Sequence, residues 1–255
     1  MNTSAVLPFL RLFLLITSTI AAAAAGNVIN DYFDRSSDAI DKPEKAAIVE
    51  SIGPNKIKIV YLLCLLIAFG SAGLFDILLS AYWLTIYQLV VSAFLFFYSY
   101  KLKKWPLVGN MTVALLCAVS LAIVVFAVDV CTGSTCVTGN EFWFYVSFAF
   151  LVTLFREIVK DIEDMEGDRV AGCQTIPILF GKKTAVWLAT LPMLLTLILL
   201  LALTASPNAA VIATLLFTAF LAIQFRLFRA DEKTDFQRIS QLTKWLMLPA
   251  LLLLF

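Results

Sequence analysis

The stretch NDYFDRSSD, residues 30–38, decides how the rest of this sequence is interpreted, because it continues directly from a long apolar run. Asp31, Asp34 and Asp38 are spaced i, i+3 and i+7, so a helix places the three carboxylates on one face. Asn27 falls a turn earlier on the same stripe. Like charges at this spacing destabilise an isolated helix, and we therefore expect a cation to bridge them.

A second copy of this spacing lies in KDIEDMEGDR, residues 160–169, at the end of another apolar run. Asp161, Asp164 and Asp168 repeat the i, i+3, i+7 pattern, and Glu157 precedes them by one turn. One such cluster is also typical of a solvated turn. Two copies, each following an apolar segment, favour a shared function.

The composition indicates a polytopic membrane protein. Of 255 residues, 61% are hydrophobic and 15% are charged, and the mean hydropathy is +0.92. The absence of His excludes Ser-His-Asp chemistry, histidine bases and imidazole metal sites. A metal would therefore be a hard ion with oxygen ligands, and Mg²⁺ is the first choice. We expect membrane lipids as partners and no nucleic acid.

Eight apolar runs approach the length of about 20 residues that spans a bilayer. They are residues 6–26, 57–76, 82–100, 107–128, 142–159, 184–205, 209–228 and 242–255.

The basic residues assign one side of the membrane to the cytoplasm. Alternate threading places the connections 30–56, 101–106, 160–183 and 229–241 on one side, and 18 of the 19 Lys and Arg residues lie in or beside them. By the positive-inside rule this side is cytoplasmic, and both acidic motifs face it. We expect these connections to form a cap over a central cavity. The exception, Arg11, lies within the first run, where it can snorkel, pair or have a function.

Two aspartate stripes on one side suit a polyanion, because they can hold metal ions on either side of a diphosphate. Basic residues on the same side complement its charge. They are Lys42, Lys45, Lys101, Lys103, Lys104, Arg156, Lys160, Arg169, Lys182 and Lys183. A membrane cavity and a diphosphate together indicate a prenyl diphosphate.

These motifs resemble those of the UbiA-type intramembrane prenyltransferases. Residues 30–38 match the family's NDxxDxxxD motif, and residues 161–168 match its second Asp-rich motif. The segment YSYKLK, residues 98–103, followed by Gly109-Asn110, resembles the Tyr and Lys segment between the two. The resemblance covers nearly the whole chain. It implies an all-α, polytopic, UbiA-like helix bundle of about eight transmembrane helices, with residues 1–255 forming one membrane-embedded domain.

The resemblance also implies roles for individual residues. Catalysis and Mg²⁺ coordination fall to Asp31, Asp34, Asp38, Asp161, Asp164 and Asp168. Substrate binding falls to Asn27, Asn30, Tyr98 and Lys103, and from the basic residues on the same side we add Lys42, Lys45 and Arg169 as substrate-binding candidates. Stabilising the leaving diphosphate lets the allylic C–O bond ionise, and an acceptor nucleophile then attacks the prenyl carbon. Asp38, Asp168, a Tyr and the released diphosphate are all candidates for the base.

The acceptor is suggested by two segments, REIVKDIEDMEGD at residues 156–168 and DKPEK at residues 41–45. Both are similar to the branch that adds geranylgeranyl to geranylgeranylglyceryl phosphate. Branches that prenylate aromatic rings for quinones, or esterify chlorophyllide, share the two motifs and remain alternatives. A cation-coupled transporter and a noncatalytic prenyl-lipid binder are alternatives of another class.

Two further expectations concern the start of the chain and its cysteines. Family members usually have an additional helix before the one that carries the first motif, whereas this chain reaches Asn30 after one helix. We therefore expect the family's first helix to be absent. Cys131 and Cys136 share a short polar loop, in which a disulfide and free thiols are both open.

Overall fold

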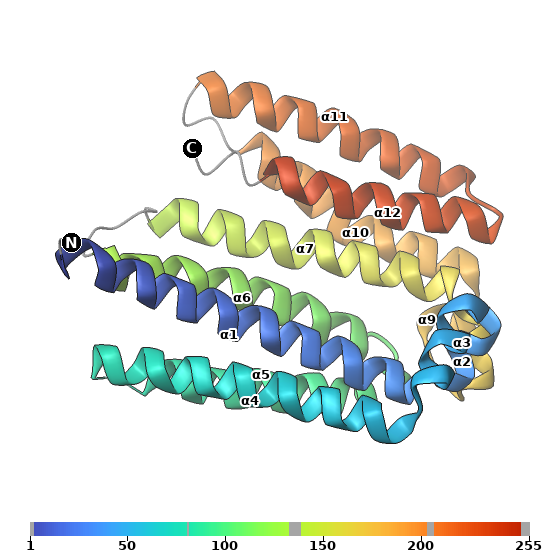
Figure 1. Ribbon diagram of the computed structural model, residues 1–255. Coiled ribbons are helices and arrows are strands. Elements are labelled where there is room, and N and C mark those ends of the chain that lie inside the picture. Colours follow the sequence, from blue (N-terminus) through green and yellow to red (C-terminus); the bar gives the residue numbers. More distant parts are fainter. Residues whose placement is uncertain (1–2, 81, 133–138, 203–206, 251–255) are drawn as a thin grey trace. The chain divides into compact units, whose positions relative to one another are not determined.

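The computed structural model describes residues 3–80, 82–132, 139–202 and 207–250, and every regular element in this part of the chain is helical (Figure 1). The helices are α1 (Thr3–Phe33), α2 (Arg35–Asp41), α3 (Pro43–Ile52), α4 (Pro54–Leu79), α5 (Trp83–Tyr100), the 3₁₀ turn η1 (Leu102–Lys104), α6 (Val108–Thr132), α7 (Gly139–Glu163), α8 (Met165–Val170), α9 (Ile176–Phe180), α10 (Lys182–Leu201), α11 (Pro207–Arg229) and α12 (Lys233–Ala250).

Seven helices in the described ranges are long and apolar enough to cross a membrane, which confirms an all-α, polytopic membrane protein. They cover Leu7–Phe33, Pro54–Leu79, Trp83–Tyr100, Val108–Ala127, Phe142–Glu163, Lys182–Leu201 and Ala210–Arg229. Each overlaps one of the first seven predicted spans. The first is longer than predicted, because α1 continues through Asn30 into the acidic motif.

The eighth predicted span, residues 242–255, begins inside α12, which is not among the seven. Lys233, Asp235 and Arg238 of α12 precede this span, in the predicted connection 229–241, and the end of the span lies outside the described part of the chain, so the eighth span stays a prediction. Residues 251–255, Cys136 and the side chain of Cys131 lie outside the description, so the disulfide question falls there as well.

Glycine and proline set the junctions between the short polar helices and the long apolar ones. Gly53 separates α3 from α4 with φ +81°, a conformation that residues other than glycine rarely adopt. Pro54 follows at the first turn of α4, where a missing N–H removes no helical hydrogen bond. The chain therefore passes from α3 into α4, the second spanning helix, through the single residue Gly53.

The chain divides into two compact units, Met1–Lys103 with Ala122–Cys136, and Lys104–Leu121 with Val137–Phe255. In the first unit α1 packs against α4 and α5 (Figure 1). Small residues make this approach close, since Ala21, Ala22 and Ala68 form a buried contact. A Cβ added to Gly26 would lie 3.0 Å from Leu95 Cδ2, so a larger residue there would require the Leu95 side chain to shift.

Polar groups join the helices of the first unit at the end opposite the acidic motif. Arg11 Nη2 donates a 2.8 Å hydrogen bond to the Leu78 carbonyl at the C-terminus of α4, so this intramembrane arginine has a capping partner. The buried Asp76 accepts hydrogen bonds from the N–H groups of Leu84 and Thr85, at 3.2 and 2.8 Å, and so caps α5. These contacts give both charges a structural role.

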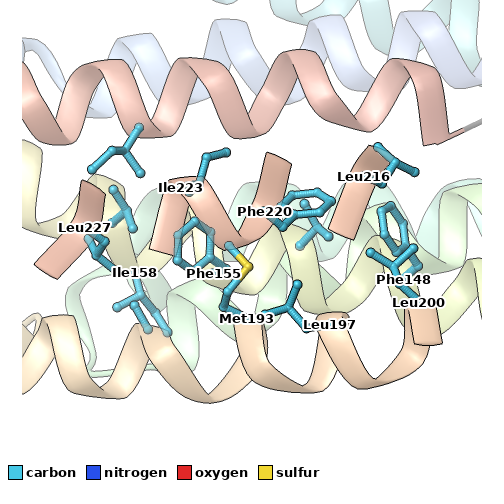
Figure 2. Packing of buried hydrophobic residues seen from close by; sticks show 14 of the residues in the cluster. Phe148, Phe155, Ile158, Met193, Leu197, Leu200, Leu216, Phe220, Ile223 and Leu227 are labelled. Carbon is cyan, nitrogen blue, oxygen red and sulfur yellow. The ribbon is translucent and has the colours of Figure 1, made fainter. Parts of the chain in front are cut away.

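In the second unit α7 packs against α10 and α12, and α11 packs against α10 and α12. Figure 2 shows Phe155 from α7, Met193 from α10 and Phe220 from α11 in the shared apolar core. Phe155 and Phe220 are fully buried. Dispersion between interlocked side chains holds such helices together in lipid, because hydrocarbon chains are as apolar as the side chains themselves. The core fixes α7, and the last turn of α7 contains Asp161, the first aspartate of the second acidic motif.

Candidate functional site

The first acidic motif lies where α1 ends and α2 begins. Asp31 is in the last turn of α1, Asp34 occupies the junction with φ −88° and ψ 2°, and Asp38 is in α2. The Asp34 N–H donates to the Asn30 carbonyl at 2.9 Å, and the Asp38 N–H donates to the Asp34 carbonyl at 2.8 Å. These bonds carry the helical register across the junction, so the carboxylates keep the predicted stripe.

Two lysines of the first unit lie among these carboxylates. Lys45, from α3, places its Nζ 2.6 Å from Asp31 Oδ1 and 2.8 Å from Asp38 Oδ2. Because one ammonium contacts both, Asp31 and Asp38 must face the same way. Lys103, from η1, forms an ion pair with Asp34 and donates to Asn30 Oδ1 at 3.2 Å.

Asn30 completes this cluster by donating from Nδ2 to Asp34 Oδ2 at 2.6 Å. Burial lowers the pKa of Lys45, but hydrogen bonds and charge interactions with Asp31 and Asp38 outweigh burial and raise this pKa above its ordinary value. Lys45 is therefore a full positive charge at neutral pH. The prediction that a cation bridges the first stripe is confirmed, and in this structure the cations are lysine side chains.

The second acidic motif has the same backbone arrangement. Asp161 is near the end of α7, Asp164 occupies the junction with φ −93° and ψ 12°, and Asp168 is in α8. The Asp164 N–H donates to the Lys160 carbonyl at 2.9 Å, and the Asp168 N–H donates to the Asp164 carbonyl at 3.0 Å. The repeated spacing in the sequence thus corresponds to a repeated helix junction with the middle aspartate at the break.

Asn110, in the first turns of α6, supplies a partner for the second motif. This buried side chain donates from Nδ2 to Asp161 Oδ2 at 2.9 Å. One turn before Asp161, the buried Glu157 accepts a 2.6 Å hydrogen bond from Arg156 Nη1. The second unit therefore places an amide and a guanidinium beside its acidic residues.

Asn110 was not among the predicted site residues, although the Gly109-Asn110 pair was noted in the sequence. Its signal is an amide side chain at the start of an otherwise apolar span, where an unpaired polar group would be costly. The partner of that amide lies 51 residues away, so only the fold identifies it.

The other predicted substrate residues lie on elements that adjoin the two motifs. Tyr98 is half-buried near the end of α5, and Lys42 lies between α2 and α3. Asn27 is exposed on α1, and Arg169 is exposed on α8. The structure thus brings Asn30, Lys45 and Lys103 to the first motif, and the roles of these other four residues stay predictions.

The donor atoms of both motifs fit a hard divalent cation. They are carboxylate and amide oxygens, which Mg²⁺ prefers, and the chain has no His. In the described part of the chain, no three Asp, Glu or Cys side chains already converge into one ligand cluster. In the first motif, lysine ammonium groups lie between the carboxylates instead. Metal coordination by the six aspartates stays a prediction.

These features define a class of protein, a helical integral membrane protein with two aspartate-rich helix junctions. The model of the UbiA prenyltransferase family matches residues 1–247, and the chain belongs to this family.

Relatives and solved structures agree with this family. Digeranylgeranylglyceryl phosphate synthase from Pyrococcus horikoshii is 38% identical over 199 residues, a match that covers 75% of this chain and 64% of that protein. The chain spans about three fifths of the length of several relatives with this name.

A solved structure of digeranylgeranylglyceryl phosphate synthase is 25% identical, with a TM-score of 0.64, and the match covers 99% of this chain and 91% of that chain. A UbiA homolog from Archaeoglobus fulgidus bound to GPP and Mg²⁺ has a TM-score of 0.65 at 16% identity, covering 96% of this chain and 88% of that chain. At that identity the likeness shows the fold alone.

Proposed function

We propose that this chain transfers a geranylgeranyl group from geranylgeranyl diphosphate to the free hydroxyl of geranylgeranylglyceryl phosphate, with Mg²⁺, and releases diphosphate. The observation that carries the proposal is the repeated junction with its middle aspartate, Asp34 in one unit and Asp164 in the other. Relatives named digeranylgeranylglyceryl phosphate synthase support the choice of acceptor.

The first motif supplies the groups that a prenyl diphosphate requires. Asp31, Asp34 and Asp38 would hold Mg²⁺, with the amide oxygen of Asn30 beside them. Bound Mg²⁺ neutralises charge on the leaving diphosphate. The Lys103 side chain is only 14% exposed, and its ammonium lies at Asp34, where it would contact diphosphate oxygens. Within the second unit, Asp161, Asp164 and Asp168 would hold Mg²⁺ in the same way.

In the proposed reaction, the bond between the prenyl carbon and the diphosphate oxygen breaks, and its electron pair leaves with diphosphate. The glycerol hydroxyl oxygen attacks that carbon and forms an ether, and its proton passes to a base. In this proposal the side chains of the two motifs, together with Lys103, orient and stabilise the diphosphate. The distribution of Lys and Arg supports a reaction on the cytoplasmic side, since the predicted cytoplasmic connections hold nearly all of them.

The test is product formation by the purified chain in lipid vesicles with Mg²⁺ and geranylgeranyl diphosphate. Geranylgeranylglyceryl phosphate, 4-hydroxybenzoate, a naphthoate and chlorophyllide are offered as separate acceptors. We expect the diether from the first acceptor alone, and we expect EDTA to abolish its formation. A prenylated aromatic compound or chlorophyllide would show that the proposed acceptor is wrong and that the proposed reaction type, prenyl transfer, is right.

If no acceptor gave a product, the proposal that this chain is a prenyltransferase would be wrong. In that case flux of Mg²⁺ or H⁺ across the vesicle membrane would support a transporter, and retained binding of the prenyl diphosphate would support a lipid binder. Asp34→Asn serves as the inactive comparison, and Asp231→Asn is the matched control because the Asp231 side chain is 96% exposed.

A further inference from the structure

Lys45 is more exposed than Lys103, although both contact carboxylates of the first motif. Its side chain is 41% exposed and contacts Asp31 and Asp38, which lie on either side of the junction between α1 and α2. The Lys103 side chain is 14% exposed and contacts both Asp34 and Asn30. Solvent and ions therefore reach Lys45 more easily than Lys103.

The position of the Lys45 ammonium conflicts with a metal ion bridging the same two oxygen atoms. Its Nζ is 2.6 Å from Asp31 Oδ1 and 2.8 Å from Asp38 Oδ2. Mg²⁺ binds its oxygen ligands at about 2.1 Å, so an ion shared by these two atoms would occupy the gap that holds the ammonium. Only one of the two cations can lie there at a time.

We propose that Lys45 is a displaceable counter-ion of the first motif. In the metal-free protein its ammonium offsets the repulsion between Asp31 and Asp38 and keeps both carboxylates facing one point. A divalent cation displaces it from that point, and the freed ammonium then contacts the diphosphate that arrives with the metal. This role deepens the proposed function and rests on it.

Two opposite effects of removing Lys45 follow from this exchange. A divalent cation no longer competes with an ammonium, so the metal alone binds more tightly. The diphosphate loses one cationic partner, so the prenyl substrate binds more weakly. A purely structural lysine would weaken both, because its loss would disturb the carboxylates. The opposite signs are therefore specific to a counter-ion that is exchanged.

The experiment measures Mn²⁺ binding to the purified full chain by the EPR signal of free Mn²⁺, without prenyl diphosphate. Mn²⁺ is the probe because it accepts the same oxygen ligands as Mg²⁺. We expect Lys45→Met to bind Mn²⁺ about 3- to 10-fold more tightly, the range expected for removing one or two partly exposed ion pairs. We expect its KM for geranylgeranyl diphosphate to rise severalfold. Lys45→Arg should return both values toward those of the unchanged protein.

Lys56→Met is the matched control, because Lys56 is an exposed lysine at the start of α4, and we expect it to change neither value. Lys45→Gln repeats the measurement with a polar side chain if Lys45→Met fails to fold. Equal or weaker Mn²⁺ binding in the folded variant would overturn the proposal. If Lys45→Met binds Mn²⁺ more tightly but the unchanged protein forms no product with any acceptor, the exchange between Lys45 and the metal stands and the proposed reaction is wrong.

Discussion

The two acidic motifs share a backbone arrangement and differ in the residues that contact them. Asp34 and Asp164 occupy equivalent breaks, with φ of −88° and −93° and ψ of 2° and 12°. In the first unit, ammonium groups of Lys45 and Lys103 contact the carboxylates. In the second unit the neutral amide of Asn110 contacts Asp161, and the guanidinium of Arg156 contacts Glu157 one turn earlier. Local spacing therefore set the backbone, and distant residues set the electrostatics.

The contacts of Lys45 and Asn110 differ in what each can do to the carboxylates that it touches. An ammonium partner can be exchanged for another cation, whereas a buried amide orients one carboxylate oxygen and carries no charge. The first motif is suited to gaining and losing cations. The second is suited to holding Asp161 in one orientation. Three experiments sharpen or break this comparison.

The largest effect is expected from substitutions of Asp34 and Asp164, which occupy equivalent breaks in the two motifs. Asp34→Asn and Asp164→Asn should each lower kcat for diether formation by about 100-fold or more, because each removes a negative ligand from the proposed metal site. Steady-state kinetics with saturating Mg²⁺ measure this. Asp231→Asn should match the unchanged chain. Normal turnover in either variant would show that the two junctions are not equivalent.

A smaller effect is expected at Asn110. Asn110→Leu removes the hydrogen bond to Asp161 and should lower activity or metal affinity by about 10-fold, as is typical when the partner of a metal ligand is lost. Asn110→Ser keeps a donor and should recover part of the loss. Kinetics and Mn²⁺ binding measure the two effects separately. Unchanged Mn²⁺ affinity together with a lower melting temperature would indicate that Asn110 only supports the fold.

The smallest effect is a difference in pH dependence between the two kinds of partner. Because the folded protein raises the pKa of Lys45, its contribution to stability is complete below the unfolded value of 10.5 and is lost as the pH rises through the higher folded value. The melting temperature in EDTA should therefore differ between Lys45→Met and the unchanged chain by a constant amount from about pH 6 to 9, and the difference should shrink above about pH 10.5.

The amide of Asn110 does not titrate in this range. The difference in melting temperature between Asn110→Leu and the unchanged chain should therefore stay constant through pH 10.5 and above. Differential scanning fluorimetry across the pH series measures both variants. A Lys45→Met deficit that disappears near neutral pH would contradict the assignment of a raised pKa.

Much of the fold could be predicted from the sequence, because a bilayer imposes a length and an apolar composition on every spanning helix. Seven predicted spans correspond to observed helices, and the i, i+3, i+7 spacing placed Asp31 and Asp38 on one face, as their shared contact with Lys45 shows. The eighth span stays a prediction, because its last residues, 251–255, lie outside the described part of the chain.

By itself, then, the sequence determined what depends on neighbours a few residues apart, namely the spans, the two stripes and the restriction to oxygen ligands that follows from the absence of His. Only the tertiary structure decided which distant groups lie at those stripes. Lys103 is 69 residues from Asp34, Asn110 is 51 from Asp161, and Arg11 is 67 from the carbonyl it caps. The physical reason is that periodicity fixes which face of a helix a residue occupies, whereas helix packing fixes what that face contacts.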